Sequence, residues 1–317
     1  MPLFATIWAD CRGLPKMINQ HYLLKHRELF QYVIGISYAQ FVALLPKFSS
    51  ALRKAENDKA WKKRRIREPG GGRKATLKTD AEKLFFILLY YKAYPTFRFA
   101  QVMFGFDKRN IQLWVRFLEQ ALFEAVGYEL ELPKRKIRNQ QEWLEICPQL
   151  SDFLVDSTER AIQRPKDKEK QKQYYSGKKK HHTVKNQIFV HPKTKKILAV
   201  SATVEGKRSD KTLFVDDSAY TELPPGAKGM ADKAYIGIEH PFLTWTIPKK
   251  KPKGKELSEE DKENNRQISK IRIYVEHPNA YMKHFNILSN RFRSRIEKAE
   301  VPLKTIAAIY NFTRPPT

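Results

Sequence analysis

Residues 153–186 constrain this chain more than any other part of its sequence. The segment opens with the apolar run 153–155, which leads into one carboxylate, Asp156, and a dense cationic stretch follows at once. A short apolar run of this kind predicts a buried β-strand. A carboxylate at the end of such a strand, next to lysines that can hold a polyanion, indicates metal-dependent chemistry on a phosphodiester.

The charge of the whole chain supports a polyanionic partner. The 317 residues include 60 Lys and Arg against 34 Asp and Glu, which gives a formal net charge of +26. The hydrophobic content of 41% is enough to bury a core, so we do not expect a disordered polycation. An excess of this size indicates binding to nucleic acid but says nothing about the fold. A ribosomal or other RNA-bound protein is the plainer alternative.

The cysteines and the hydropathy pattern limit the compartment. Cys11 and Cys147 are the two cysteines and form no CxxC motif, which fits a reducing compartment and excludes a zinc ribbon. No apolar run reaches the ~20 residues that a membrane-spanning helix needs. Asp10 and Arg12 interrupt the N-terminal apolar patch, so we expect no signal peptide. The sequence therefore predicts a cytoplasmic protein without membrane contact.

Changes in composition divide the chain into five segments. We expect an N-terminal helical region over residues 1–58 and a basic linker over 59–78, which contains Gly70, Gly71 and Gly72. A DNA-binding helical domain follows over 79–128 and a connector over 129–150. The remainder, residues 151–317, is the expected catalytic domain.

Residues 79–126 have the pattern of a helix-turn-helix unit. Thr79 or Asp80 can cap a first helix, Pro95 separates it from a short second helix, and Gly105 precedes a third helix capped by Asp107. The third helix has an apolar face with Ile111, Val115, Leu118 and Leu122. Its other face is basic and amide-bearing, as in a helix that reads the major groove, although three packed helices with polar outer faces are also common. The predicted DNA-binding residues of this helix are Lys108, Arg109, Asn110, Gln112 and Arg116.

After residue 150 the periodicity changes from helical to β-rich. Short strands are expected over residues 153–155, 183–190, 197–204, 229–232 and 243–247, with the second and third forming a hairpin. Helices are expected over 210–218 and 258–285. The chain is therefore predicted to be of the α+β or α/β class, with an all-helical N-terminal part and a mixed β-sheet flanked by helices.

Three acids are candidates for a two-metal site. Asp156 and Asp232 each follow an apolar run, where a side chain can face a cleft at the strand ends, and Glu276 lies on the last long helix. Arg272 and Lys283 share a helical face with Glu276. These cations could form a solvated ion pair with Glu276 or bind DNA phosphates beside the metals.

A basic turn follows the first strand. Tyr174 and Tyr175 could stack on unpaired bases at a cleaved end, and packing in the core is an equal alternative. The residues that follow are expected to contact phosphates: Lys178, Lys179, Lys180, His181 and His182.

These residues carry a resemblance to a known family. The phrases VDSTE, YYSGKKKHHTVK, ADKAYIG and IYVEH, with Asp156, Asp232 and Glu276, resemble bacterial insertion-sequence transposases of the DDE class, which are related to Harbinger-type elements. The resemblance covers Thr79 to the end of the chain. It implies a ribonuclease-H-like catalytic domain with two Mg²⁺ or Mn²⁺ ions, binding to terminal inverted repeats and target DNA, and a homodimer or larger synaptic complex in the prokaryotic nucleoid.

The chain departs from the family pattern at several positions. Arg272, Glu276 and Lys283 match the family's Tyr-Arg-Glu-Lys signature, but Ser269 stands at the position of the tyrosine. Pro278 is expected to kink the last helix and could move Lys283 off the shared face. Ser209 and Asp210 stand where the family often has His-Asp. Asp210 is therefore a secondary candidate for the site, with a structural rather than a catalytic role expected. These departures leave two alternatives open: a nuclease that cuts without joining, and a DNA-binding protein without catalysis.

Overall fold

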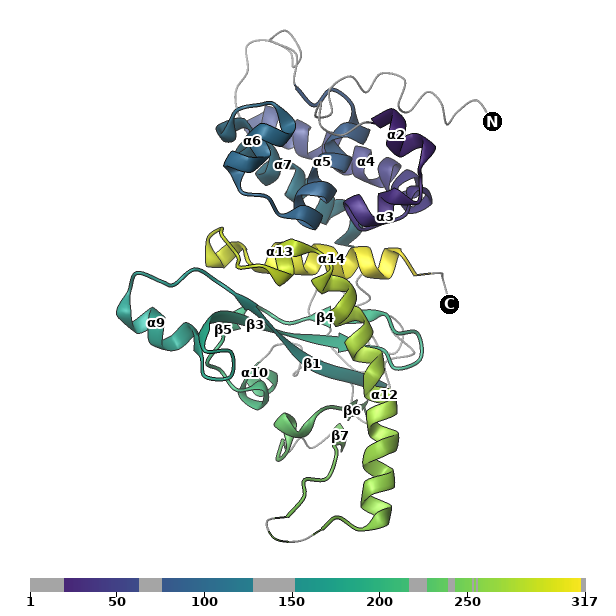
Figure 1. The fold of residues 1–317 in the computed structure, drawn as a ribbon, viewed down its shortest axis with the longest axis vertical. Coiled ribbons are helices and arrows are strands. Elements are labelled where there is room, and N and C mark those ends of the chain that lie inside the picture. Colours follow the sequence, from purple (N-terminus) through teal and green to yellow (C-terminus); the bar gives the residue numbers. More distant parts are fainter. Residues whose placement is uncertain are drawn as a thin grey trace. The chain divides into compact units, whose positions relative to one another are not determined.

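The computed structural model describes residues 20–62, 76–127, 152–216, 227–238, 243–252, 254 and 256–314 (Figure 1). The predicted connector and most of the predicted linker lie outside these residues. The chain forms two compact units. One comprises Met1–Tyr128 and His284–Ile287, and the other comprises Glu129–Lys283 and Leu288–Thr317.

The first unit is helical. Its helices are α2 (Gln20–Lys25), α3 (Leu29–Ile34), α4 (Tyr38–Lys62), α5 (Asp80–Ala93), α6 (Phe97–Phe104) and α7 (Lys108–Val126). Helix α4 therefore continues into the segment predicted to be linker. Thr79 caps α5 through a capping box with Glu82, whose carboxylate also accepts a hydrogen bond from the backbone of Lys78.

Helix α5 is buried on all sides. Every residue from 81 to 91 is buried, including Glu82 and Lys83. The reason is that α3, α4 and α7 all pack against α5. A helix enclosed by neighbours can be apolar all round.

The two helices predicted on either side of Gly105 are present as α6 and α7. Gly105 ends α6 with φ of 68°, in the left-handed region that glycine adopts without strain, and Asp107 caps α7 through the backbone N–H of Arg109. The predicted apolar face of α7 is buried, and Lys108, Arg109, Asn110 and Arg116 are exposed, with Gln112 half-buried.

The second unit contains a mixed seven-stranded sheet with the order β2-β3-β1-β6-β7, and β4 and β5 also pair with β3. The strands are β1 (Asp152–Ala161), β2 (Tyr175–Ser176), β3 (His181–Val190), β4 (Ile197–Val200), β5 (Val204–Glu205), β6 (Ala227–Met230) and β7 (Leu243–Thr246). Strand β3 is antiparallel to β1 and β4, whereas β6 is parallel to both β1 and β7. The mixed sheet and the β3–β4 hairpin confirm the sequence predictions.

Strand β1 is longer than predicted. The sequence pattern ends the strand at Val155, but β1 continues to Ala161 because its polar second half pairs with β3, from Leu154↔Val190 to Ala161↔Thr183. Asp156 is therefore in the middle of β1. It does lie beyond the point where the neighbouring strand β6 stops at Met230.

The remaining described elements of the second unit are helices. They are α9 (Lys168–Tyr174), α10 (Asp210–Asp216), the 3₁₀ helices η2 (Lys233–Tyr235) and η3 (Ile296–Lys298), α12 (Glu259–Lys283), α13 (Asn286–Ser289), whose first two residues belong to the first unit, and α14 (Glu300–Phe312). Helix α12 contacts β1 and β3, and α14 contacts β4 and α12 (Figure 1). Asn311 holds α14 to the sheet edge through both the N–H and the C=O of Ile197.

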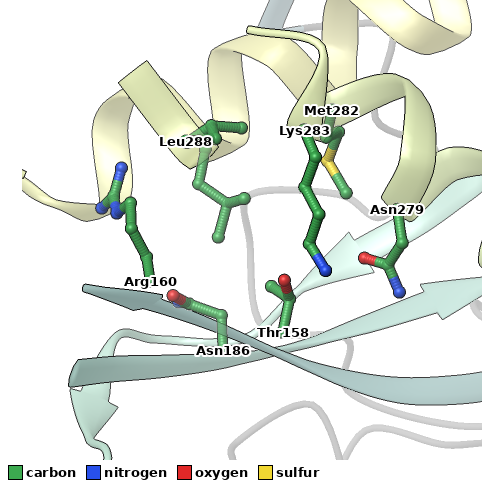
Figure 2. A pocket seen from close by; sticks show the side chains of 8 residues that line it. Thr158, Arg160, Asn186, Asn279, Met282, Lys283 and Leu288 are labelled. Carbon is green, nitrogen blue, oxygen red and sulfur yellow. The ribbon is translucent and has the colours of Figure 1, made fainter. Parts of the chain in front are cut away.

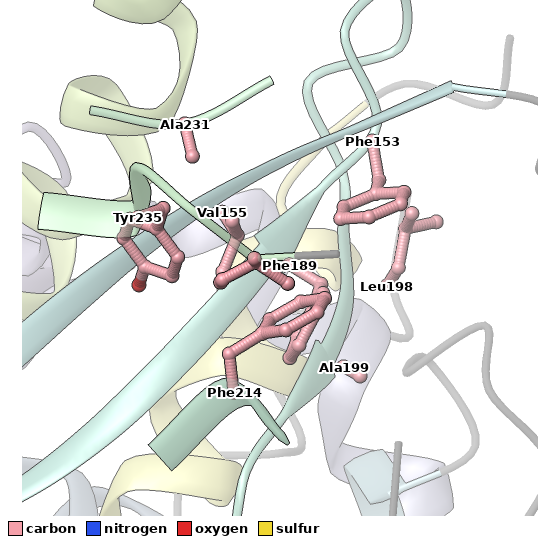
Figure 3. Packing of buried hydrophobic residues seen from close by; sticks show 9 residues of the cluster. Phe153, Val155, Phe189, Leu198, Ala199, Phe214, Ala231 and Tyr235 are labelled. Atoms are coloured by element: carbon pink, nitrogen blue, oxygen red, sulfur yellow. The ribbon is translucent and has the colours of Figure 1, made fainter. Parts of the chain in front are cut away.

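The two faces of β1 are different. Phe153 and Val155 point into an apolar cluster with Phe189, Phe214 and Tyr235 (Figure 3). Asp156 and Thr158 alternate with these residues and lie on the other face, toward α12. The apolar face fixes the strand, and the polar face carries the candidate chemistry.

Candidate active site

The pairing of β1 with β6 places two of the predicted carboxylates side by side. The two strands run parallel, with Leu154 opposite Met230. Asp156 and Asp232 each follow two residues later, so both side chains leave neighbouring backbones at the same level. The pKa of Asp156 responds to the charge of Asp232, which agrees with this proximity.

Local hydrogen bonds hold Asp232 in place. Its carboxylate caps η2 by accepting from the backbone N–H of Ala234 at 2.8 Å. Tyr235, in the same short helix, is fully buried and its hydroxyl lies 3.1 Å from Ser157 Oγ. Gln187 Nε2 donates to this hydroxyl at 2.9 Å and to the carbonyl oxygen of Asp210 at 2.8 Å. The segment with Asp232 is therefore tied to β1 next to Asp156.

Burial raises the pKa of the Asp156 carboxyl above its ordinary value. The backbone N–H of Ser157 and the charge of Arg272 oppose this rise, and the charges of Asp232 and Asp210 add to it. A cation stabilises the charged form of a carboxylate whose pKa is raised by burial and by a neighbouring acid. Carboxylate oxygens are also the ligands that Mg²⁺ and Mn²⁺ prefer. The pair therefore fits a divalent metal ion.

Glu276 is on α12 and its side chain is exposed. Arg272 and Asn279 are four residues before and three after it, so the three share a helical face. Arg272 acts electrostatically on Asp156, and Asn279 donates a hydrogen bond to it. Within the described residues, no group of three His, Cys, Asp or Glu side chains is arranged to hold a metal. The structure thus brings Asp156 and Asp232 together, and Glu276 lies exposed on the helix whose Asn279 contacts Asp156.

Asp210 begins α10 and belongs to a buried ion cluster. Its Oδ1 lies 2.9 Å from Lys185 Nζ, which is also 3.7 Å from Glu159 and donates to the carbonyl of Arg208 at 2.7 Å. Lys185 is only 6% exposed, so the cluster joins β3 to α10 away from solvent. These contacts agree with the structural role expected for Asp210.

Helix α12 is continuous through Pro278 to Lys283. Lys283 therefore stays in the same helix as Arg272 and Glu276, and its side chain lines a small pocket with Asn279 and Thr158 (Figure 2). Ser269, at the position of the family tyrosine, donates its hydroxyl hydrogen to the carbonyl of Asn265.

The basic turn lies between β2 and β3. Lys178, Lys179 and Lys180 are exposed, and Lys180 has φ of 57°. His181 and His182 begin β3, where burial lowers the pKa of His182 and the neighbouring Arg164 and His181 add to this effect. Tyr175 is 42% exposed and contacts the His182 ring edge-on, whereas Tyr174 is half-buried at the end of α9.

Three residues of the site were not recognised in the sequence. Asn279, Tyr235 and Gln187 all belong to hydrogen-bond networks around the two aspartates. Asn279 has a detectable signal, since it follows Glu276 by three residues on a helix. The roles of Tyr235 and Gln187 have no local signal, because their partners lie on elements distant in the chain.

Comparisons with known proteins identify the family of this chain. The family of DDE superfamily endonucleases matches residues 155–311. A probable transposase for insertion sequence element IS702 from Microchaete diplosiphon is 34% identical over 232 residues, which cover 73% of this chain and 79% of that protein. No solved structure matches. The chain therefore belongs to the DDE-type insertion-sequence transposases.

Membership of this family defines a nuclease-type enzyme with DNA as the substrate. DDE endonucleases generally use divalent metal ions, which agrees with the donor atoms of Asp156 and Asp232. Among the helices of the described segments, none has the length and apolar character to cross a bilayer.

Proposed function

We propose that this protein cuts DNA at the terminal inverted repeats of a mobile element and joins the freed ends to target DNA. The single observation that carries the proposal is the register between β1 and β6, which sets Asp156 and Asp232 side by side. In this proposal Asp156, Asp232 and Glu276 are the ligands of two Mg²⁺ or Mn²⁺ ions, and the sheet unit is ribonuclease-H-like.

The residues of the site have separate tasks. Asp156 and Asp232 hold the ions from the sheet, and Glu276 contributes the third carboxylate from α12. When bound, divalent ions stabilise charge on the attacking and leaving oxygens of a phosphodiester. Arg272 and Lys283 hold phosphates on either side of Glu276.

The reaction consists of two in-line displacements. In the first, the oxygen of water forms a bond to phosphorus while the bond from phosphorus to the 3′ oxygen breaks, which leaves a 3′-hydroxyl and a 5′-phosphate. In the second, that 3′-hydroxyl attacks a phosphodiester of the target and displaces its 3′ oxygen. The DNA itself supplies the second nucleophile, so no covalent protein intermediate is required.

DNA recognition is assigned to exposed residues of both units. Lys108, Arg109, Asn110, Gln112 and Arg116 of α7 would read the terminal repeat, as in a helix-turn-helix protein. The turn with Lys178, Lys179 and Lys180 and the adjacent His181 and His182 would contact the backbone. Joining of two element ends requires both ends in one complex, so the active form is a homodimer or larger assembly.

The test is cleavage of a labelled duplex that carries the element's own terminal repeat, in Mg²⁺. Wild type, Asp232→Ala and a control, Asp216→Ala, would be compared, because Asp216 is an exposed acid on α10. We expect nicking at the repeat boundary by wild type and the control, and binding without nicking by Asp232→Ala. Binding without cleavage by wild type in Mg²⁺ or Mn²⁺ would contradict the proposal in favour of a DNA-binding protein. Cleavage without joined products would identify a nuclease that does not join.

A further inference from the structure

Asn279 connects the helix that carries Glu276 to the carboxylate of Asp156. Its Nδ2 donates to Asp156 Oδ2 at 2.9 Å, although the two residues lie on α12 and β1 and are far apart in the sequence. Asn279 is 8% exposed and Asp156 is half-buried, so this hydrogen bond is partly buried. A partly buried amide–carboxylate bond restricts the orientation of the carboxylate.

The second oxygen of Asp156 is also held. Its Oδ1 accepts from the backbone N–H of Ser157 at 2.9 Å. A carboxylate offers about four acceptor positions in all. Each oxygen of Asp156 therefore uses one position for the protein and keeps one for a cation. The two donors fix the plane of the carboxylate and leave acceptor positions on both oxygens.

The oxygen of the Asn279 side-chain amide differs from its nitrogen. Its Oδ1 is buried and has no hydrogen-bond partner among the described residues. Figure 2 shows this oxygen turned toward the pocket into which Lys283 also points, next to Thr158 of β1. The cavity volume is about 10 Å³, which is room for about one water. A buried polar atom without a partner normally costs stability. Because only the nitrogen of this amide has a partner among the described residues, its bond to Asp156 is the contact that orients the side chain.

The position of Asn279 follows from the helix around it. Val275, Pro278, Asn279 and Met282 form the buried stripe of α12 against the sheet. Pro278 and Asn279 are part of the segment in which this chain departs from its family's usual sequence. Asn279 therefore contacts Asp156 at the point where the helix meets β1.

We infer that Asn279 is a positioning residue, which orients Asp156 for metal binding and couples it to the helix that carries Glu276. The inference rests on the proposed metal site. Residues that orient metal ligands typically contribute 10–100-fold to metal affinity or activity. Loss of Asn279 should accordingly weaken metal binding while all three carboxylates remain.

The test compares Asn279→Leu and Asn279→Ala with wild type and with Asn264→Leu. Asn264 is an exposed asparagine on the same helix and serves as the control. Mn²⁺ binding would be measured by electron paramagnetic resonance, thermal unfolding in EDTA would report stability, and the Mg²⁺ concentration for half-maximal nicking would be measured separately. The alanine variant keeps the test valid if the bulkier leucine prevents folding.

We expect both Asn279 variants to bind Mn²⁺ at least tenfold more weakly and to recover most of their nicking at high Mg²⁺. Asn264→Leu should behave as wild type, and Asp156→Ala should not recover. A lower unfolding temperature with unchanged Mn²⁺ affinity and Mg²⁺ requirement would show a purely structural role and overturn the inference. Absence of Mn²⁺ binding and nicking by wild type would instead overturn the proposed function, and the role of Asn279 with it.

Discussion

The two faces of β1 show how one strand serves two opposite requirements. On one face, Phe153 and Val155 pack into an aromatic cluster, and Ser157 bonds to the buried hydroxyl of Tyr235. On the other face, Asp156 is a half-buried carboxylate with a raised pKa, and the side-chain oxygen of Asn279 has no hydrogen-bond partner among the described residues. The first face stabilises the fold, whereas the partly buried charge on the second face lowers the free energy of unfolding. Sites that bind charge commonly show such a loss of stability.

The largest expected effect is on the apolar face. Phe153→Ala should lower the free energy of unfolding of the sheet unit by about 3–5 kcal/mol, because the ring is fully buried against Phe189, Phe214 and Trp245. Urea denaturation would measure the change. Thr158→Ala on the other face should cost less than about 1 kcal/mol. Equal losses for the two variants would contradict the difference between the faces.

A smaller loss is expected for Tyr235→Phe. The ring remains, but Ser157 and Gln187 lose a shared partner in a buried place. The free energy of unfolding should fall by about 1–2 kcal/mol. The apparent Mg²⁺ affinity should fall as well, because η2 no longer holds Asp232 against β1. An unchanged unfolding midpoint in urea would show that this network does not support the site.

Asp156→Asn should raise the free energy of unfolding at neutral pH, whereas the preceding variants lower it. Burial raises the pKa of Asp156 in the folded protein above its unfolded value of about 3.9. The folded state therefore loses stability as pH rises from the unfolded value through the raised folded value, and the loss is complete above it. Asparagine carries no charge, so the variant should gain stability at neutral pH and nothing below the unfolded pKa of about 3.9.

Thermal unfolding in EDTA at acidic and neutral pH would measure this gain. Mg²⁺ should then stabilise wild type more than the variant, because only wild type has both aspartates. A wild type that is more stable than Asp156→Asn in EDTA at neutral pH would show that the polar face does not carry the expected electrostatic cost.

The smallest effect on stability is expected in the helical unit. Arg109 is exposed on α7, so Arg109→Ala should change the free energy of unfolding by less than about 0.5 kcal/mol. Binding to the terminal repeat should weaken, and the slope of the logarithm of affinity against the logarithm of salt should fall by about 1 if Arg109 contacts a phosphate. Gln120→Ala, on the same helix and also exposed, is the control. Equal binding by both variants would remove α7 from the DNA interface.

Local sequence patterns predicted the elements of the fold well. The capped helices α5 and α7, the hairpin of β3 and β4 and the long helix α12 all follow from periodicity and turn residues. The sequence pattern places Asp156 at the end of a strand, yet β1 continues to Ala161. The polar residues after Asp156 form a strand only because β3 is available to pair with them. Propensity alone does not contain that information.

The sequence by itself determined which residues could carry the chemistry: acids after apolar runs, cations on α7 and near β3, and a helix with Arg272, Glu276 and Lys283. Only the tertiary structure decided that Asp156 and Asp232 are neighbours and that Asn279 binds Asp156. The role of Glu276 stays a prediction. The physical reason is that periodicity reports which face of an element is buried, whereas the pairing of β1 with β6 and the packing of α12 depend on segments distant in the chain.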